Sequence, residues 1–214
     1  MKTIALIDYG SGNLHSAERA LRVAAVNADA PREICVTSDP AALASADQIV
    51  LPGVGHFADC AANLRAVGGL IEALEEAVLK RSVPFLGICV GQQLLADRGL
   101  EDGVTPGLGW IKGDVARITP GPGYRIPHMG WNALTLIRPH PVLSGLGDDP
   151  HVYFTHSYAY TNTDTENIAA TTDYGQPLIA AIGRDNLFAT QFHPEKSQTV
   201  GLKLLSNFIL WDPS

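Results

Sequence analysis

The chain has 214 residues, 46% of them hydrophobic, and a formal charge of -7 at pH 7. This length predicts one core and a single domain over residues 1–214, and the acidic balance excludes a broad nucleic-acid-binding surface. No apolar run approaches the roughly 20 residues that span a bilayer, the N-terminus lacks a signal-peptide pattern, and three cysteines without paired spacing fit a reducing compartment. We therefore expect a cytoplasmic protein.

The first ninety residues alternate between strand and helix patterns, which predicts an α/β fold with an open, mostly parallel sheet flanked by helices. Ligands of such sheets bind at the carboxyl ends of the strands. The predicted strands are 3–8, 34–37, 48–51 and 83–88, and the predicted helices are 14–25, a turn after Asp39-Pro40, a stretch over 57–80 interrupted at Gly68-Gly69, and one starting at 92–97.

The second half is rich in β patterns, and we expect it to wrap the same core. Glycine and proline are frequent from residue 99 to 150, and the strands there read as antiparallel. The predicted strands are 114–119, 131–137, 152–160, 168–172, 178–182 and 187–192, and an amphipathic helix over 200–211 closes the chain.

Cys89 stands where a short apolar strand meets a helix, between Gly87 and Gly91. This is the pattern of a nucleophile elbow, in which flanking glycines let strand and helix approach and the central residue projects above the sheet. A helix N-terminus and a nearby imidazole favour the thiolate, the nucleophilic form of cysteine. Cys35 and Cys60 lack such a frame and are predicted to be small buried hydrophobes.

His193 closes a predicted strand and Glu195 follows it across Pro194. The carboxylate can hold one imidazole nitrogen while the other faces Cys89, which fixes the tautomer of a general base. The sequence therefore predicts a nucleophile, a base and an orienting carboxylate.

Two segments can supply hydrogen-bond donors to a developing oxyanion. The N–H of Val90 directly follows the nucleophile, and glycines flank Val54 in the loop Gly53-Val54-Gly55 after a strand that we expect beside the elbow strand. We predict an oxyanion hole formed by Val90, Val54 and Gly55. The other glycine loop, residues 10–12, lacks the third glycine of the dinucleotide pattern and the lysine of a P-loop, so neither binding site is predicted. The seven histidines show no metal-ligand spacing, and we predict no metal and no cofactor.

These motifs resemble the class I (triad) glutamine amidotransferases, and more narrowly the glutaminase subunits of imidazole glycerol phosphate synthases. The resemblance runs from the first strand to the last helix, and it departs from the family at Gln92, where methionine is frequent. The segments that carry it are Asp8 to Leu14, Pro52 to Phe57, Gly87 to Leu95, Pro127 to Asn132, His156 to Tyr158 and Gln191 to Ser197.

The resemblance implies that glutamine is hydrolysed and that its ammonia passes to a (β/α)8-barrel cyclase subunit in a heterodimer. It places residues 10–12 near the interface and the active-site face. The implied glutamine-binding residues are Gly53, Gln93, Ser157 and Tyr158, with Glu101 a weaker candidate that could instead be a solvated loop carboxylate. The implied partner-facing residues are Trp131, Asn132 and Lys196, with a core position as the alternative for Trp131.

Two alternatives remain open. Another triad glutaminase, such as that of pyridoxal phosphate synthase, lacks support because its expected Gly-Gly-Glu-Ser segment is absent. A binding module that kept the fold without catalysis would have no reason to retain Cys89, His193 and Glu195 together. Release of glutamate from glutamine separates an enzyme from such a module.

Overall fold

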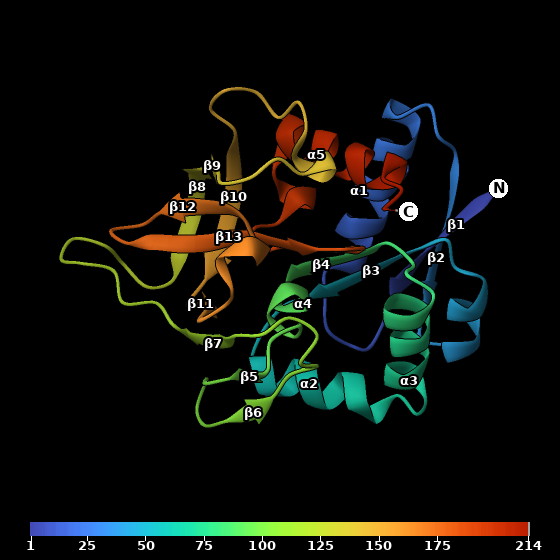
Figure 1. Cartoon of the computed structure of the whole chain (residues 1–214), viewed down its shortest axis with the longest axis horizontal. Coiled ribbons are helices and arrows are strands. Elements are labelled where there is room, and N and C mark those ends of the chain that lie inside the picture. The colour runs from blue at the N-terminus through green and yellow to red at the C-terminus, as the bar shows by residue number, and fades with distance from the viewer. Residues whose placement is uncertain (214) are drawn as a thin grey trace.

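A computed structural model describes residues 1–213 of the chain (Figure 1). The first half alternates strands and helices, as the sequence predicts. Its elements are β1 (Lys2–Ile7), α1 (Leu14–Asn27), β2 (Arg32–Thr37), a 3-10 helix (Pro40–Ser45), β3 (Gln48–Gly53), α2 (Phe57–Ala66), α3 (Leu70–Glu75), a π-helical turn (Glu76–Lys80), β4 (Phe85–Cys89) and α4 (Val90–Gln93).

The second half is mostly strand and ends in a helix. Its strands are β5 (Arg98–Gly99), β6 (Thr105–Pro106), β7 (Asp114–Arg117), β8 (His128–Ala133), β9 (Thr135–Leu136), β10 (His151–His156), β11 (Tyr158–Thr161), β12 (Ile168–Asp173), β13 (Pro177–Arg184) and β14 (Leu187–Thr190). Its helices are α5 (Gln198–Leu210) and 3-10 turns at Pro141–Leu143, Thr165–Asn167 and Pro194–Lys196.

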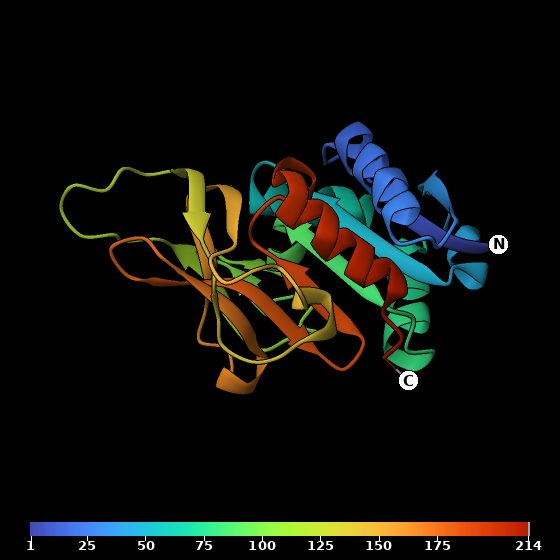
Figure 2. The same cartoon turned by 90° about the horizontal axis from the view of Figure 1, so that it is seen from above.

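The largest sheet has eight strands in the order β2-β1-β3-β4-β14-β13-β12-β9. Its first five strands are parallel, and the remaining three join antiparallel beyond β14. Helices α1 and α5 lie together on one face of the parallel part, with α2 and α3 on the other (Figures 1 and 2). Two smaller sheets, β10-β8 and β11-β7-β5-β6, complete the β-rich part.

This topology brings three carboxyl strand ends together. Strand β4 is flanked by β3 and β14, with Gly53 paired to Cys89 and Thr190 paired to Ile88. Strands β3 and β4 are buried along their whole length, and the alanine-rich face of α1 packs into the same core. The loops that follow β3, β4 and β14 therefore meet at the carboxyl ends of these buried strands, which is where ligands bind in open parallel sheets.

The predicted interruption at Gly68-Gly69 is confirmed, whereas several other predicted elements differ from the observed ones. Gly69 adopts φ +80° and separates α2 from α3. The strand predicted over 131–137 begins at His128 and is divided into β8 and β9, and the short strands β5 and β6 were not predicted. The strand predicted over 152–160 is divided at Ser157 into β10 and β11. The helix predicted after the elbow is a single turn, because the carbonyls of Leu94 and Leu95 accept hydrogen bonds from the loop at 108–111 and not from the next helical turn.

No helix within residues 1–213 is both long and apolar enough to cross a membrane. The main hydrophobic cluster contains residues from both halves of the chain, from Ile4 in β1 to Trp211 after α5. A single domain over residues 1–214 remains our prediction for the organisation of the chain.

Gly91 is expected to be the most sensitive glycine of the elbow. A Cβ on Gly91 would overlap the backbone carbonyl oxygen of Leu51, which cannot move without displacing β3. We expect Gly91→Ala to lower the free energy of unfolding by about 3 kcal/mol or more, as overpacking of a rigid site does. Gly68→Ala is the matched control, since its Cβ would meet nothing within 4 Å. Equal urea midpoints for the two variants would contradict this account of the elbow.

Candidate active site

Cys89 occupies a strained turn at the end of β4. Its backbone has φ +55° and ψ -110°, a region that residues with a side chain rarely adopt. The turn is possible because the backbones of Gly87 and Gly91 approach so closely that a Cβ on Gly87 would lie 2.7 Å from the Gly91 oxygen. The thiol is nearly buried, at 4% exposure, and lines a cavity. These are the features of a nucleophile elbow.

His193 and Glu195 meet Cys89 from the end of β14. The imidazole Nδ1 lies 2.7 Å from Glu195 Oε1, and both side chains are almost fully buried. The backbone on either side of the ring is fixed, because His193 N–H donates to Tyr153 O and Ser197 Oγ donates to His193 O. The carboxylate therefore holds one imidazole nitrogen and leaves Nε2, which is buried, for Cys89.

The neighbours of His193 favour its positively charged form. Burial alone lowers the pKa of His193, but its interactions with the Cys89 thiol and the Glu195 carboxylate outweigh burial and raise the pKa to about 10. An imidazolium is thus present at neutral pH beside the sulfur. Such a neighbour stabilises the thiolate, which is the nucleophile.

A cavity of about 480 Å³ opens over Cys89 and has the size of a small-molecule site. It contains most of the residues that the sequence predicted. Its lining is Asn13, Val54, Gly55, Cys89, Val90, Gln93, Glu101, Pro127, Thr155, His156, Ser157, Tyr158, His193 and Lys196.

The predicted oxyanion donors lie on two sides of the cavity. Val90 is the first residue of α4, so its N–H has no partner within the helix. Val54 and Gly55 form the facing loop, with Gly55 at φ +103°. The thiol of Cys60 donates to Val54 O at 3.4 Å, and burial raises the pKa of Cys60, which keeps this donor protonated.

The predicted glutamine-binding residues fall into two groups. Gln93, Ser157 and Tyr158 line the cavity, and Gln93 Nε2 donates to Tyr158 O at 3.0 Å. Glu101 also lines it, but one of its oxygens accepts the Phe57 N–H at 2.9 Å and so caps the start of α2. Glu101 is thus a partly buried, hydrogen-bonded loop carboxylate, and its role in holding the substrate ammonium stays a prediction. Gly53 does not line this cavity, because it is packed beneath Tyr9 and Val90.

The predicted partner-facing residues lie beside the cavity. Lys196 lines it and extends its Nζ over the Tyr153 ring, 5.9 Å from the centroid. Trp131 lies on β8 with 48% of its surface exposed, which excludes the alternative of a core tryptophan. Asn132, also on β8, is held by hydrogen bonds to Asp173 O and to the ring of His128.

Several residues of this region were not predicted from the sequence, and Pro127 and Thr155 of the cavity lining are among them. Asn13 and His156 line the cavity, His128 lies behind it, and Gln191 lies beneath it with Nε2 3.7 Å from Cys89 Sγ. The segments that carried the family resemblance include all of Asn13, His128, His156 and Gln191, and that position was the only available signal. His128 Nδ1 lies 3.0 Å from His156 Nε2, a contact between β8 and β10 that no spacing in the sequence reveals.

Buried neutral histidines predict a loss of stability in acid. Burial lowers the pKa of His128, His140 and His156 to about 4 in each case, whereas unfolded histidine has a pKa of about 6.5. As the pH falls from 6.5 towards 4, these three histidines therefore bind protons in the unfolded chain but stay neutral in the folded chain. We expect urea unfolding to show a loss of about 1 to 2 kcal/mol per histidine between pH 7 and pH 5, and no contribution from these groups between pH 8 and pH 7. Equal stability at pH 7 and pH 5 would contradict it.

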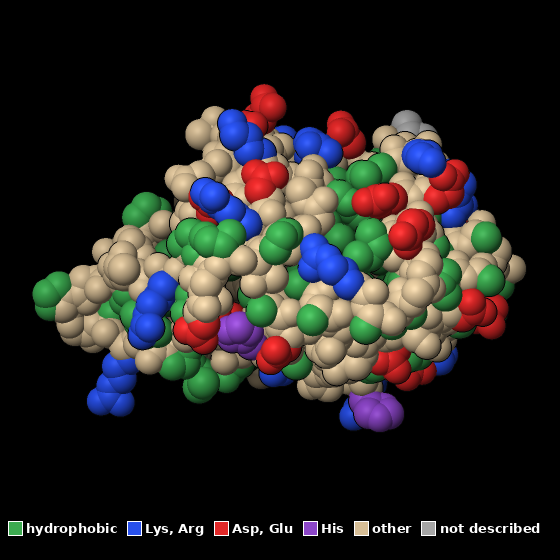
Figure 3. Space-filling model, turned by 90° about the horizontal axis from the view of Figure 1, so that it is seen from below, with side chains coloured by type: hydrophobic (Ala, Val, Ile, Leu, Met, Phe, Trp, Pro, Cys, Tyr) green, Lys and Arg blue, Asp and Glu red, His purple; other side chains and the backbone are tan. Residues whose placement is uncertain are grey.

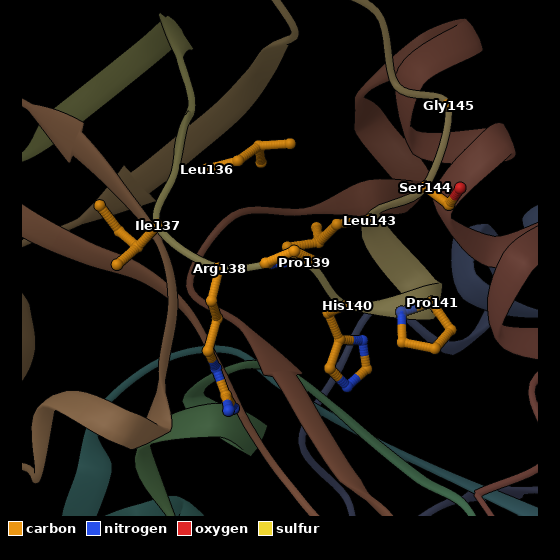
Figure 4. A pocket seen from close by; sticks show the side chains of 9 residues that line it. All are labelled: Leu136, Ile137, Arg138, Pro139, His140, Pro141, Leu143, Ser144 and Gly145. Atoms are coloured by element: carbon orange, nitrogen blue, oxygen red, sulfur yellow. The ribbon is translucent and has the colours of Figure 1, made fainter.

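Outside the cavity over Cys89, the described surface carries a further hollow but no group of metal ligands. Within residues 1–213 no group of three or more His, Cys, Asp or Glu could hold a metal ion. A hollow of about 630 Å³ lies over the turn at 136–145 and is lined mainly by apolar side chains (Figure 4). It shares no lining residue with the cavity over Cys89. On the face drawn in Figure 3, basic and acidic side chains are interspersed among apolar ones.

Comparisons with known proteins show the family of the chain. The family model described as glutamine amidotransferase class-I matches residues 5–211. Among curated proteins, the imidazole glycerol phosphate synthase subunit HisH of Caulobacter vibrioides is 55% identical, with all of both chains covered. The protein of the same name from Mesorhizobium japonicum is 53% identical, with 98% of this chain and 99% of the relative covered.

Solved structures share the fold. A structure described as a glutamine amidotransferase superposes with TM-score 0.70 at 19% identity, covering 96% of this chain and 97% of the other. A glutamine amidotransferase from Thermotoga maritima superposes with TM-score 0.60 at 17% identity, covering 91% and 76%. With the elbow, the buried His193–Glu195 pair and these likenesses together, the chain belongs to the class I glutamine amidotransferase family and, within it, to the HisH subunits of imidazole glycerol phosphate synthase.

Proposed function

We propose that this chain is the glutaminase subunit of an imidazole glycerol phosphate synthase, which hydrolyses glutamine to glutamate and ammonia for histidine biosynthesis. The observation that carries the proposal is the strained Cys89 beside the Glu195-held His193, both lining a cavity large enough for glutamine. The relatives that are more than half identical over the full chain bear the name of that synthase subunit.

The reaction proceeds through a thioester. The Cys89 thiolate attacks the carboxamide carbon of glutamine, and negative charge develops on the carboxamide oxygen next to the Val90 N–H. His193, having taken the thiol proton, delivers it to the departing ammonia. His193 then removes a proton from water, which attacks the thioester carbon, and glutamate leaves as Cys89 is regenerated. Glu195 keeps the ring oriented and stabilises the imidazolium.

The ammonia is used by a cyclase subunit. In this proposal a (β/α)8-barrel partner combines it with a phosphoribulosyl aminoimidazole carboxamide nucleotide to form imidazole glycerol phosphate and an aminoimidazole carboxamide ribotide. Exposed apolar side chains on β8 support a docking face beside the cavity, since Trp131 is 48% and Met129 62% exposed. Lys196, which lines the cavity, and Asn132 on β8 lie next to this docking face.

Activity is expected to depend on the partner. The loop of Val54 and Gly55 can adopt more than one backbone orientation at little cost because glycine tolerates both signs of φ. We propose that the free subunit favours an orientation in which the loop donor points away from the oxyanion. A hundredfold activation on assembly needs only about 2.7 kcal/mol of differential stabilisation.

Glutamate release from glutamine tests this function directly. We expect slow release by the chain alone, a modest rise with the cyclase, and a steep rise when the cyclase and its nucleotide are added together. Trp131→Ala should weaken assembly, whereas Leu210→Ala, which removes an apolar side chain that is 57% exposed on α5, should not. No release under any of these conditions would refute the glutaminase assignment. The full rate from the isolated chain would refute only the dependence on the partner.

A further inference from the structure

We propose that Gln191 is a positioning residue for the nucleophile: its side-chain amide donates to Cys89 Sγ, and a directed chain of hydrogen bonds prevents the amide from turning round. Gln191 is completely buried between β14 and His193, with Nε2 3.7 Å from the sulfur. Within residues 1–213 no other side chain donates a hydrogen bond to this sulfur, and the buried Nε2 of His193 has no hydrogen-bond partner. The proposal rests on the proposed function in that Cys89 is the nucleophile.

The backbone carbonyl of Tyr158 determines which end of the Gln191 amide is oxygen and which is nitrogen. Tyr158 O can only accept, so the Gln93 atom 3.0 Å from it must be the NH₂ nitrogen. That same nitrogen lies 2.9 Å from Gln191, whose facing atom must therefore be its oxygen. The nitrogen of Gln191 is then the atom left for Cys89. The hydrogen bonds of Gln93 therefore fix Nε2 of Gln191 as the donor to the Cys89 sulfur.

A pair of neutral histidines fixes the same carbonyl from the other side. His156 Nδ1 lies 2.9 Å from Tyr158 O and must carry the proton, so its Nε2 accepts from Nδ1 of His128 at 3.0 Å. His128 Nε2 in turn accepts from Asn132 Nδ2, which must be the nitrogen because it also donates to Asp173 O at 2.8 Å.

This order of donors requires both rings to be uncharged. Burial lowers the pKa of each histidine to about 4, which agrees with it. Each group from Asn132 through His128 and His156 therefore donates to the next, and the last acceptor is Tyr158 O. Gln93 donates to the same carbonyl and to Gln191, and Gln191 donates to the Cys89 sulfur. The Tyr158 carbonyl fixes the His156 end of the pair, and the Asn132 amide, itself oriented by Asp173 O, fixes the His128 end. The network therefore has a single consistent arrangement at neutral pH.

An amide donor on the sulfur favours the thiolate and holds it in one rotamer under the attacked carbon. Hydrogen bonds to charged groups stabilise more than neutral ones do. The other titratable groups near the sulfur are His193 after β14, Tyr9 after β1 and Cys60 on α2. Burial raises the pKa of Tyr9 and of Cys60, so both stay neutral around pH 7. His193 and Gln191 are then the two groups that stabilise negative charge on the sulfur.

The test is the pH dependence of Cys89 alkylation by iodoacetamide, followed on the Cys89 peptide by mass spectrometry. Gln191→Met keeps the volume and removes the donor, and we expect the alkylation midpoint to rise by about one pH unit. The kcat/KM for glutamine should fall about tenfold in the complex with the cyclase, mainly through kcat. Gln191→Glu keeps an acceptor for Gln93 and removes the donor, so it should raise the midpoint at least as far and decides the matter if the methionine variant folds poorly.

Gln92→Met is the matched control. Gln92, on the elbow helix α4, is as buried as Gln191, but its Nε2 donates to Ala189 O and not to Cys89 Sγ. It should leave the midpoint unchanged. A wild-type midpoint and kcat in a folded Gln191→Met protein would overturn the proposal and leave Gln191 a packing residue. Alkylation needs neither glutamine nor a partner, so a shifted midpoint without glutaminase activity would instead count against the proposed function.

Discussion

Replacing Cys89 with alanine is expected to abolish glutamine-dependent synthesis by the complex while synthesis from added ammonium salts continues. In the proposed mechanism Cys89 alone supplies the covalent step, because it is the thiol at the elbow that lines the cavity. Loss of a nucleophile commonly costs on the order of 10⁴-fold or more in turnover. In the proposed function the partner also accepts free ammonia, so its own reaction does not need the thiol. Formation of imidazole glycerol phosphate from each nitrogen source is the measurement.

Cys35→Ala is the control for this experiment. Cys35 lies on β2 at the edge of the large sheet, away from the three strand ends that form the site. It should keep both activities. Loss of ammonium-dependent synthesis in an assembled Cys89→Ala complex would refute the division of labour between the subunits.

Replacing His193 with asparagine is expected to lower glutaminase turnover by about 10²- to 10⁴-fold, the usual contribution of a positioned general acid and base. Asparagine keeps a polar group of similar size at the end of β14 but cannot carry a proton between sulfur and leaving ammonia. It also removes the imidazolium, whose pKa near 10 reflects its interactions with Cys89 and Glu195. Alkylation of Cys89 at pH 7 should slow in parallel.

The fold of this variant must be checked separately, since the ring is buried and hydrogen-bonded to Glu195. Circular dichroism and retained ammonium-dependent synthesis by the complex serve that purpose. Near-normal glutamine hydrolysis by a folded His193→Asn protein would rule out His193 as the base.

Local patterns were enough to predict the elbow and its partners. Gly87 and Gly91 flank Cys89 because the turn allows no Cβ at either position, and that requirement is visible as a spacing. The pairing of His193 with Glu195 is also local, since the two are separated only by Pro194. The parallel half of the sheet followed from short apolar strands alternating with amphipathic helices, which is likewise a property of neighbouring residues.

Tertiary hydrogen bonds account for what the sequence did not reveal. The elbow helix stops after one turn because the loop at 108–111 takes the carbonyls that a longer helix would use. His128 and His156 are 28 residues apart and meet only because β8 pairs with β10. Glu101 caps α2 from 44 residues away. None of these contacts has a periodicity or a spacing, so each depends on the assembled fold.

The most direct test of the central claim is to look for glutamyl label on Cys89 during turnover. The chain is incubated with carbon-labelled glutamine, the cyclase and its nucleotide, quenched in acid and mapped by peptide mass spectrometry. We expect one glutamyl group on the peptide that contains Cys89, lost on treatment with hydroxylamine and absent from Cys89→Ala. Steady release of glutamate with Cys89 unlabelled, and at the same rate from Cys89→Ala, would contradict the account.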